Sequence, residues 1–349
     1  MLNSNYTTLD RFVYLESRLS GSDVPDDLKS KAVEMIKIAR RSLKYGQNIF
    51  WVETTEKYIN WIISLPWKKS TEIELDIKKA EKILEKNHYG LKDLKRRILE
   101  FISIHILHKQ KNLGPYQGPI IFLVGLAGTG KTTFAKATAE ALGRKFIRIP
   151  FGGLASVLDL RGEAKIKPEA EPGIIIKSLA RVGVNNPVIL LDELDRVTAN
   201  ARDAVMGVLL ELLDPEQNFA FRDNYIDYPF DLSKAIFITT ANNTNNISTA
   251  VLDRLEVIRM PSYTDQEKII IAKQYILPKM MKQIGITENE LKIDDALWPK
   301  LVRPLGFDPG LRSLARNIRS IVRTTAYKIV KGEAESFFIT EKNYKEFMY

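Results

Sequence analysis

Short apolar runs alternate with amphipathic stretches through the middle of the chain. Five such runs occur, and they are IIFLV (120–124), FIRI (146–149), VILLD (188–192), AIFITT (235–240) and VIRM (257–260). Continuous runs of β-branched and aliphatic residues are typical of strands that are buried on both faces. Because amphipathic stretches separate these runs, we expect parallel strands joined by helical crossovers. The pattern therefore predicts an α/β fold with a parallel sheet for this part of the chain.

The flanking segments carry apolar residues at helical spacing, first at 28–43 and again at 91–109. One face of the second helix collects Leu91, Leu94, Ile98, Phe101, Ile102 and His105. We interpret His105 as a core histidine whose hydrogen bonds are satisfied. The aromatic stretch 51–67 is interpreted as helix core in preference to a binding surface, and Pro66 is expected to end that helix. Beyond Pro261 the pattern is helical throughout.

The domain organisation follows from length and from one linker. At 349 residues the chain exceeds what a single hydrophobic core usually supports, so two or three domains are expected. The segment 114–119, GPYQGP, is rich in helix and strand breakers and is typical of a link between domains. We predict a helical N-terminal region at 1–113, an α/β domain at 114–260 and a helical domain at 261–349.

Composition limits the class of protein and the kind of metal site. The chain is 45% hydrophobic and 27% charged, and no apolar run approaches the roughly 20 residues that cross a bilayer. The N-terminus has neither a secretory nor a transit pattern, so we expect a cytoplasmic protein without a membrane partner. With no cysteine and three histidines, thiolate metal sites are excluded and a hard ion such as Mg²⁺ is expected.

The net charge of +9 suits either nucleic acid or ordinary solvated helices. The basic residues are spread along the chain in short clusters such as 95–97 and 109–111. This spacing favours solvated helix faces, and DNA stays as an alternative partner.

The segment GLAGTGKT at 125–132 matches the phosphate-binding pattern G-x-x-x-x-G-K-[ST] between a predicted strand and a predicted helix. Glycines let backbone N–H groups approach phosphate oxygens, and the helix N-terminus adds a positive dipole. Lys131 would reach the β- and γ-phosphates, and the Thr132 hydroxyl would bind Mg²⁺. A chance glycine-rich turn is disfavoured by this context. The predicted nucleotide-binding residues are Gly125, Leu126, Ala127, Gly128, Thr129, Gly130, Lys131, Thr132 and Thr133.

An acidic pair supplies the second half of this chemistry. Asp192 ends a predicted buried strand, where its carboxylate could hold Mg²⁺, and Glu193 could polarise the attacking water. Such a pair alone can be a solvated loop. Its position 61 residues after the lysine (192 minus 131) favours phosphoryl transfer. Asp195 is expected at the surface or at an interface.

Polar and cationic residues follow on later elements. Asn242 comes after the strand AIFITT, where its amide could sense phosphate or belong to a simple turn. Arg254, Arg312 and Arg316 are isolated arginines, which are usually surface ion-pair partners.

Several segments resemble, in order and spacing, the AAA+ ATPase module of the Lon ATP-dependent proteases. They include HYGL (88–91), LDPEQN (213–218), LDRLEVIRM (252–260) and ILPK (276–279), and the resemblance runs from about Trp61 to the end. It implies an AAA+ P-loop fold with a helical lid, assembled as a homo-oligomeric ring that is normally a hexamer.

The resemblance also implies roles for single residues. Asn242 would be the sensor-1 residue, Arg254 the finger that reaches a neighbouring subunit's nucleotide, and Arg312 the sensor-2 arginine of the lid. His88, Tyr89, Gly90 and Tyr263 would lie near the adenine.

Three departures from that family affect the expected function. No Ser-Lys peptidase segment occurs, so we expect no peptide cleavage by this chain. Lys167-Pro168-Glu169 stands where the family has an aromatic pore loop that grips substrate. The approach to Arg312 contains Pro304 and Pro309.

The leading hypothesis is Mg²⁺-dependent ATP hydrolysis by a ring that unfolds protein substrates for a peptidase, which could be separately encoded. The alternative is a nucleotide-switched scaffold or DNA-associated regulator with little translocation, which the altered pore loop favours and the intact Glu193 and Arg254 oppose.

Overall fold

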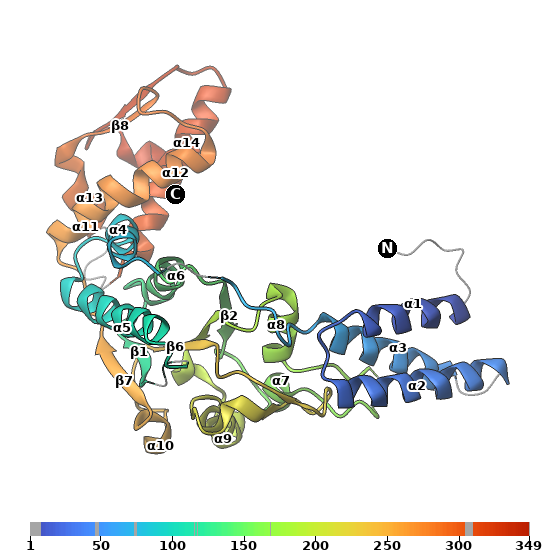
Figure 1. Ribbon diagram of the computed structural model, residues 1–349. Coiled ribbons are helices and arrows are strands. Elements are labelled where there is room, and N and C mark those ends of the chain that lie inside the picture. Colours follow the sequence, from blue (N-terminus) through green and yellow to red (C-terminus); the bar gives the residue numbers. More distant parts are fainter. Residues whose placement is uncertain are drawn as a thin grey trace.

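The computed structural model contains a central sheet with helical parts projecting from it (Figure 1). The N-terminal helices and the C-terminal helices lie at different ends of this central part. The residues that the structure describes are 8–45, 49–72, 75–114, 116, 118–167, 169–303 and 310–348.

The central sheet has five parallel strands in the order β2-β3-β6-β1-β7. The strands are β1 (Ile120–Val124), β2 (Phe146–Pro150), β3 (Val188–Asp192), β6 (Ile236–Ala241) and β7 (Leu255–Arg259). The predicted α/β class is confirmed. Strand β7 begins two residues before the predicted run because Leu255 pairs with Ile120 at the start of β1. Since all five strands run the same way, their carboxyl ends meet at one edge of the sheet.

Helices cover both faces of this sheet, as buried parallel strands require. One face packs against α4 (Ile77–Asn87), α5 (Lys92–Gln110) and α6 (Lys131–Ala141). The other face packs against α8 (Ile174–Val182) and α9 (Arg202–Leu212). Shorter elements complete this part, namely α7 (Leu158–Arg161), α10 (Thr249–Leu252), and the two-stranded β4 (Phe221–Arg222) and β5 (Pro229–Phe230).

The N-terminal helices are α1 (Thr8–Ser20), α2 (Asp26–Lys44) and α3 (Ile49–Ser64). Helix α3 ends just before Leu65 and Pro66, as predicted. The Tyr58 hydroxyl is buried and donates to the Ile226 carbonyl at 3.1 Å. Trp51 is 38% exposed, so the interpretation of the aromatic stretch as core is right for Tyr58 and wrong for Trp51.

Helices α4 and α5 share one hydrophobic core with the sheet, to which Leu84, Ile98 and Ile102 contribute. His105 packs edge-to-face on Phe101, and its buried Nε2 has no hydrogen-bond partner. The prediction of a satisfied core histidine is therefore wrong in its hydrogen bonding. The division of the chain at residues 113 and 260 stays a prediction.

The C-terminal helices form a third core around Trp298, Leu301 and Ile318. Their elements are α11 (Asp265–Ile271), α12 (Leu277–Ile284), α13 (Trp298–Val302), α14 (Arg312–Val330), and the strand pair β8 (Leu291–Ile293) and β9 (Phe337–Ile339). Pro304 and Pro309 lie outside the described residues. Across the ranges that the structure describes, no helix is long and apolar enough to cross a membrane.

Candidate nucleotide site

The loop between β1 and α6 has the backbone geometry of a phosphate cradle. Gly128 and Gly130 adopt φ angles of 82° and 97°, in the left-handed region that favours glycine. A Cβ atom on Gly125 would lie 2.6 Å from the Met260 carbonyl oxygen, so no side chain fits there. Helix α6 begins at Lys131, and the N–H groups of its first turn are available to an anion.

Lys131 lies under this loop with 7% of its surface exposed. Its Nζ donates to the carbonyl oxygens of Gly125 at 2.6 Å and Leu126 at 3.0 Å, and to Asn242 Oδ1 at 3.0 Å. Burial lowers the pKa of Lys131, although the Asp195 carboxylate acts in the opposite direction. The ammonium is therefore a partly desolvated cation that phosphate oxygens would stabilise.

Asp192, at the end of β3, is 2% exposed and faces the first turn of α6. The Thr132 hydroxyl donates to it, with Oγ1 lying 3.1 Å and 3.3 Å from the two carboxylate oxygens. The Thr240 hydroxyl donates to the same carboxylate. The two predicted metal ligands are thus in contact.

The donor set formed by Thr132 and Asp192 fits Mg²⁺. A hydroxyl and a carboxylate are hard oxygen ligands, and Mg²⁺ commonly takes one or two protein ligands and completes its shell with phosphates and water. Within the described part of the chain, no group of three or more His, Cys, Asp or Glu side chains could hold a metal ion. The arrangement accordingly suits Mg²⁺ bound together with a phosphate ligand.

Glu193 follows Asp192 in a left-handed conformation, with φ 62°, which is uncommon for a residue with a side chain. Its N–H donates to the Thr240 hydroxyl at 3.0 Å. A Cβ atom on Gly152 would lie 2.9 Å from Glu193 Oε2, so glycine makes room for the carboxylate. Arg196 Nη1 lies 3.7 Å from the same oxygen.

Asn242 directly follows the neighbouring strand β6 and is held by Asp195. Its backbone N–H donates to Asp195 Oδ1 at 3.1 Å, and its side-chain Nδ2 donates to Oδ2 at 3.4 Å. Asp195 is 7% exposed, so its predicted location at the surface or at an interface is wrong. The 3₁₀ turn Leu194–Arg196 bends the chain back and directs Asp195 toward β6.

The lid helix α14 begins beside the phosphate-binding loop. The Leu311 N–H donates to the Gly128 carbonyl at 3.0 Å. Arg312 Cγ lies 3.3 Å from the position that a Cβ atom on Gly128 would take. Arg312 is therefore adjacent to the loop, whereas Arg316 lies about one turn farther along the helix.

Arg254 is not part of this cluster. Its carbonyl accepts from the Ile120 N–H at the start of β1, so it lies at the amino edge of the sheet, opposite the phosphate-binding loop. Its Nη1 donates to the Ala250 carbonyl at 2.9 Å, and its Nη2 lies 3.4 Å from Asp214 Oδ2.

The four predicted adenine contacts lie beside α6 and the lid. His88 Nε2 is 3.1 Å from Thr133 Oγ1, its Nδ1 is buried without a partner, and burial lowers the pKa of its imidazole to about 4. The Tyr263 hydroxyl would lie 3.9 Å from a Cβ atom on Gly130, and burial raises its pKa to about 12. Tyr89 and Gly90 follow His88 and are half-buried. The unpartnered Nδ1 suits a purine, which offers hydrogen-bonding edges.

Two residues at the acidic pair were missed by sequence reasoning, namely Thr240 and Arg148. Arg148 Nε donates to Asp192 Oδ2 at 2.6 Å from the edge strand β2. The signal was an arginine inside the apolar run FIRI, where a charge is unusual without a partner.

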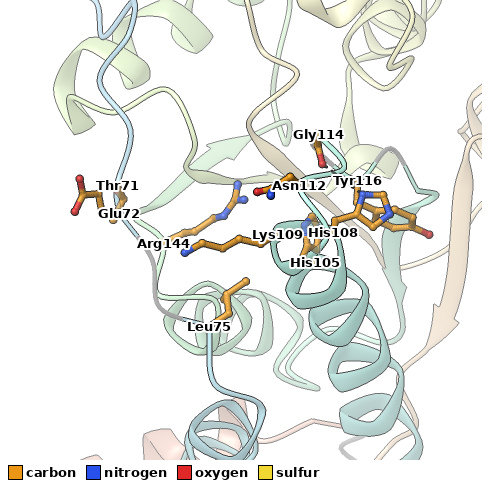
Figure 2. A pocket seen from close by; sticks show the side chains of 10 residues that line it. All are labelled: Thr71, Glu72, Leu75, His105, His108, Lys109, Asn112, Gly114, Tyr116 and Arg144. Atoms are coloured by element: carbon orange, nitrogen blue, oxygen red, sulfur yellow. Dashed lines mark hydrogen bonds between the residues drawn. The ribbon is translucent and has the colours of Figure 1, made fainter.

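A cavity of about 890 Å³ lies elsewhere and does not include this site (Figure 2). Figure 2 shows it between α5, which carries His105 and Lys109, and the side chain of Arg144. Arg144 donates to the carbonyls of Asn186 and Lys234, which precede β3 and β6. The cavity is therefore at the amino edge of the sheet, opposite the phosphate-binding loop.

The segment in the position of a pore loop contacts helix α3. Lys57 Nζ donates to the Ala170 carbonyl at 2.8 Å and lies 2.7 Å from Glu171 Oε1. Lys165 Nζ lies 4.6 Å from the centre of the Tyr58 ring. Of the predicted Lys167-Pro168-Glu169 departure, Pro168 lies outside the described residues.

Two family descriptions match the chain. The ATPase family associated with various cellular activities (AAA) matches residues 121–263, and the Lon protease AAA+ ATPase lid domain matches residues 282–337.

The relatives found carry the same family name. The Lon protease of Desulforamulus reducens is 42% identical over 330 residues, which is 95% of this chain and 40% of that protein. The Lon protease of Lawsonia intracellularis is 44% identical over 83% of this chain and 34% of its own length. That of Mycoplasma mycoides is 38% identical over 97% of this chain and 41% of its own length. The chain thus spans about two fifths of the length of these relatives or less.

Proposed function

The chain belongs to the AAA+ ATPases of the Lon type, and from this premise we propose that it binds ATP with Mg²⁺ and hydrolyses it to ADP and phosphate. The observation that carries the proposal is the convergence of Lys131, Thr132, Asp192 and Asn242 at the carboxyl ends of three neighbouring strands. These are the residue types that phosphoryl transfer requires at that edge.

The proposed roles follow from the contacts. Lys131 and the N–H groups of residues 125–133 bind the phosphates, while Thr132 and Asp192 hold the metal. Bound Mg²⁺ would neutralise charge on the phosphate oxygens. Glu193 accepts a proton from the attacking water. Asn242, held by Asp195, positions that water or the γ-phosphate, and Arg312 stabilises phosphate charge from the lid.

We propose that the adenine lies between the segment 88–90 and Tyr263. The unpartnered Nδ1 of His88 supports this, because a buried polar atom without a partner is costly unless a ligand completes its hydrogen bonding. The neutral imidazole, whose pKa burial lowers to about 4, can donate or accept one hydrogen bond at neutral pH.

The active unit in this proposal is a homo-oligomeric ring, normally of six subunits. Arg254 lies at the sheet edge opposite the phosphate-binding loop, which supports a role at the site of a neighbouring subunit. The Lon proteases among the relatives support a protein substrate and a motor that unfolds it for a peptidase. A peptidase on a separate polypeptide is a proposed partner, and this chain is proposed to contribute no peptidase activity.

A nucleotide-switched scaffold is the second candidate function. It is favoured by the contacts of Lys57 with Ala170 and Glu171, which tie the segment in the pore-loop position to α3. A segment held in this way would grip a moving polypeptide poorly. DNA is the partner considered for such a scaffold, given the net charge of +9.

The variant Glu193→Gln tests the ATPase. It should lower kcat at least about 100-fold, because a positioned base contributes about 10² to 10⁴, while ATP affinity stays near the wild-type value. Glu100→Gln, at an exposed ion pair on α5, is the matched control and should leave both quantities unchanged. Hydrolysis at the wild-type rate in Glu193→Gln would exclude the assigned base.

Two further assays separate the motor from the scaffold. A motor should unfold a tagged protein only while ATP is hydrolysed. A DNA-bound scaffold should instead bind duplex DNA with an affinity that falls steeply as salt rises. Measuring both on the same preparation decides between them.

A further inference from the structure

Arg148 places a cation on the buried carboxylate that would hold the metal. It lies on β2 opposite Leu190 of β3, and paired residues of parallel strands project on the same face of the sheet. Asp192, two residues after Leu190, therefore projects on that face as well. The Arg148 guanidinium reaches along it, and its Nε lies 2.6 Å from Asp192 Oδ2.

The charge balance at Asp192 depends on this contact. Its other side-chain partners, Thr132 and Thr240, are neutral hydroxyls. Within the described residues, Arg148 is the cation at ion-pair distance from this carboxylate. Lys131 also acts on this carboxylate by its charge, but its Nζ bonds to carbonyl and amide oxygens. Arg196 pairs with Glu193 instead. Removing Arg148 would leave a 2% exposed carboxylate without an ion-pair partner, with only the more distant Lys131 ammonium to offset its charge.

The same carboxylate cannot serve the guanidinium and a metal ion equally well. Asp192 Oδ2 accepts from Arg148 at 2.6 Å and is also the oxygen nearer to the Thr132 hydroxyl, at 3.1 Å. A divalent cation between Thr132 and Asp192 would repel the guanidinium and compete for the same lone pairs. The Arg148 side chain is 49% exposed at the edge of the sheet, so it has solvent into which it can move.

We propose that Arg148 is a placeholder cation, which neutralises Asp192 in the nucleotide-free protein and yields that carboxylate to Mg²⁺ when Mg²⁺ and ATP bind. Arg148 then acts as a positioning residue that sets how much Mg²⁺ the site needs. This inference rests on the proposed ATPase function, because it takes Thr132 and Asp192 as the metal ligands.

The experiment compares the full chain with Arg148→Gln, Arg148→Lys and a matched control, Arg97→Gln. The Arg97 side chain is 47% exposed, a fraction similar to the 49% of Arg148. Its partner Glu256 differs from Asp192, because Glu256 is 42% exposed instead of buried. Two quantities are measured, namely the melting temperature without metal and nucleotide, and the Mg²⁺ concentration at half-maximal binding of a fluorescent ATP analogue.

A placeholder predicts that both quantities fall in Arg148→Gln, because the metal-free protein loses stability while the site needs less Mg²⁺. Arg148→Gln should melt about 5 °C lower without metal, because the buried carboxylate loses its counter-ion. It should also reach half-maximal nucleotide binding at about 10-fold lower Mg²⁺, because the competitor is gone. Arg148→Lys should restore most of the melting temperature and the Mg²⁺ requirement, and Arg97→Gln should change neither.

Each other outcome overturns the inference. A lower melting temperature with an unchanged Mg²⁺ midpoint would make Arg148 purely structural. A higher Mg²⁺ midpoint would make it a support for the metal site. If the wild-type protein itself binds the nucleotide without any dependence on Mg²⁺, the proposed function fails together with the inference, whereas the first two results leave that function intact.

Discussion

At the scale of single residues, the buried His88 and the half-buried His105 make stability depend on pH. Burial lowers the pKa of His88 and of His105 to about 4, from the ordinary value of 6.5. Between these pH values the unfolded chain binds a proton at each histidine and the folded chain does not. Above pH 6.5 these two histidines therefore do not reduce the free energy of unfolding. As the pH falls from 6.5 toward 4, the free energy of unfolding decreases progressively.

We predict that His88→Phe reduces this pH dependence. Each histidine contributes a slope of about 1.4 kcal/mol per pH unit in that window, and the variant lacks one of the two. Urea denaturation at several pH values between about 7 and 5 gives the free energy of unfolding. His105→Phe should reduce the slope similarly, and a slope equal to that of the wild-type protein in both variants would contradict the assignment.

Sequence reasoning predicts which candidate site residues meet where a local motif carries them. Lys131 and Thr132 belong to one continuous segment, and the structure brings both into contact with predicted partners on other strands. Asp195 was misplaced and Arg148 was missed because both contact residues that are distant in the sequence. Asp195 meets Asn242 across 47 positions, and Arg148 meets Asp192 across 44. Only the order of the strands in the sheet brings such pairs together.

At the scale of elements, the start of α14 packs directly against the phosphate-binding loop. A Cβ atom on Gly310 would lie 2.6 Å from the Ala127 carbonyl oxygen and 2.8 Å from Gly128 Cα. We predict that Gly310→Ala displaces the start of α14 and weakens ATP binding about 10-fold or more, since the clash is with backbone atoms that have little room to move.

Nucleotide titration and thermal melting test this prediction. Gly207→Ala is the matched control, because nothing lies within 4 Å of the Cβ position at Gly207 in α9. Alanine there should stabilise the helix by up to about 1 kcal/mol and leave ATP affinity unchanged. Unchanged affinity in Gly310→Ala would show that the lid contact does not control binding.

The hydrophobic pattern predicts the helices and strands themselves, but it does not predict which elements pack against each other. The runs at 120–124 and 188–192 are strands as predicted, because both of their faces are buried. The apolar face of residues 91–109 correctly predicts a buried helix face at α5. It does not show that this face packs on the sheet beside α6, because periodicity indicates which side is buried and not what covers it.

At the scale of the whole molecule, Arg254 requires a second copy of the chain for its proposed role. It lies at the amino edge of the sheet, paired with Asp214, while the phosphate-binding loop lies at the carboxyl edge. An arginine that far from its own nucleotide can act only on a neighbour. Hydrolysis should therefore depend on assembly, and Arg254→Ala should lower kcat about 10³-fold while leaving nucleotide affinity near normal.

Mixing two inactive variants tests this directly. In a ring assembled from equal amounts of Arg254→Ala and Glu193→Gln, a site works when its own subunit keeps Glu193 and its neighbour keeps Arg254. Random assembly gives roughly a quarter of the sites this composition, one half times one half, so the mixture should regain about a quarter of the wild-type rate. In the control, the Glu193→Gln chain is replaced by a chain that carries both substitutions. No subunit of that mixture has Arg254, so its hydrolysis rate should not recover. A mixed rate equal to the mean of the two separate rates, in rings confirmed by their mass in solution, would place the arginine's action within its own subunit and overturn the shared site.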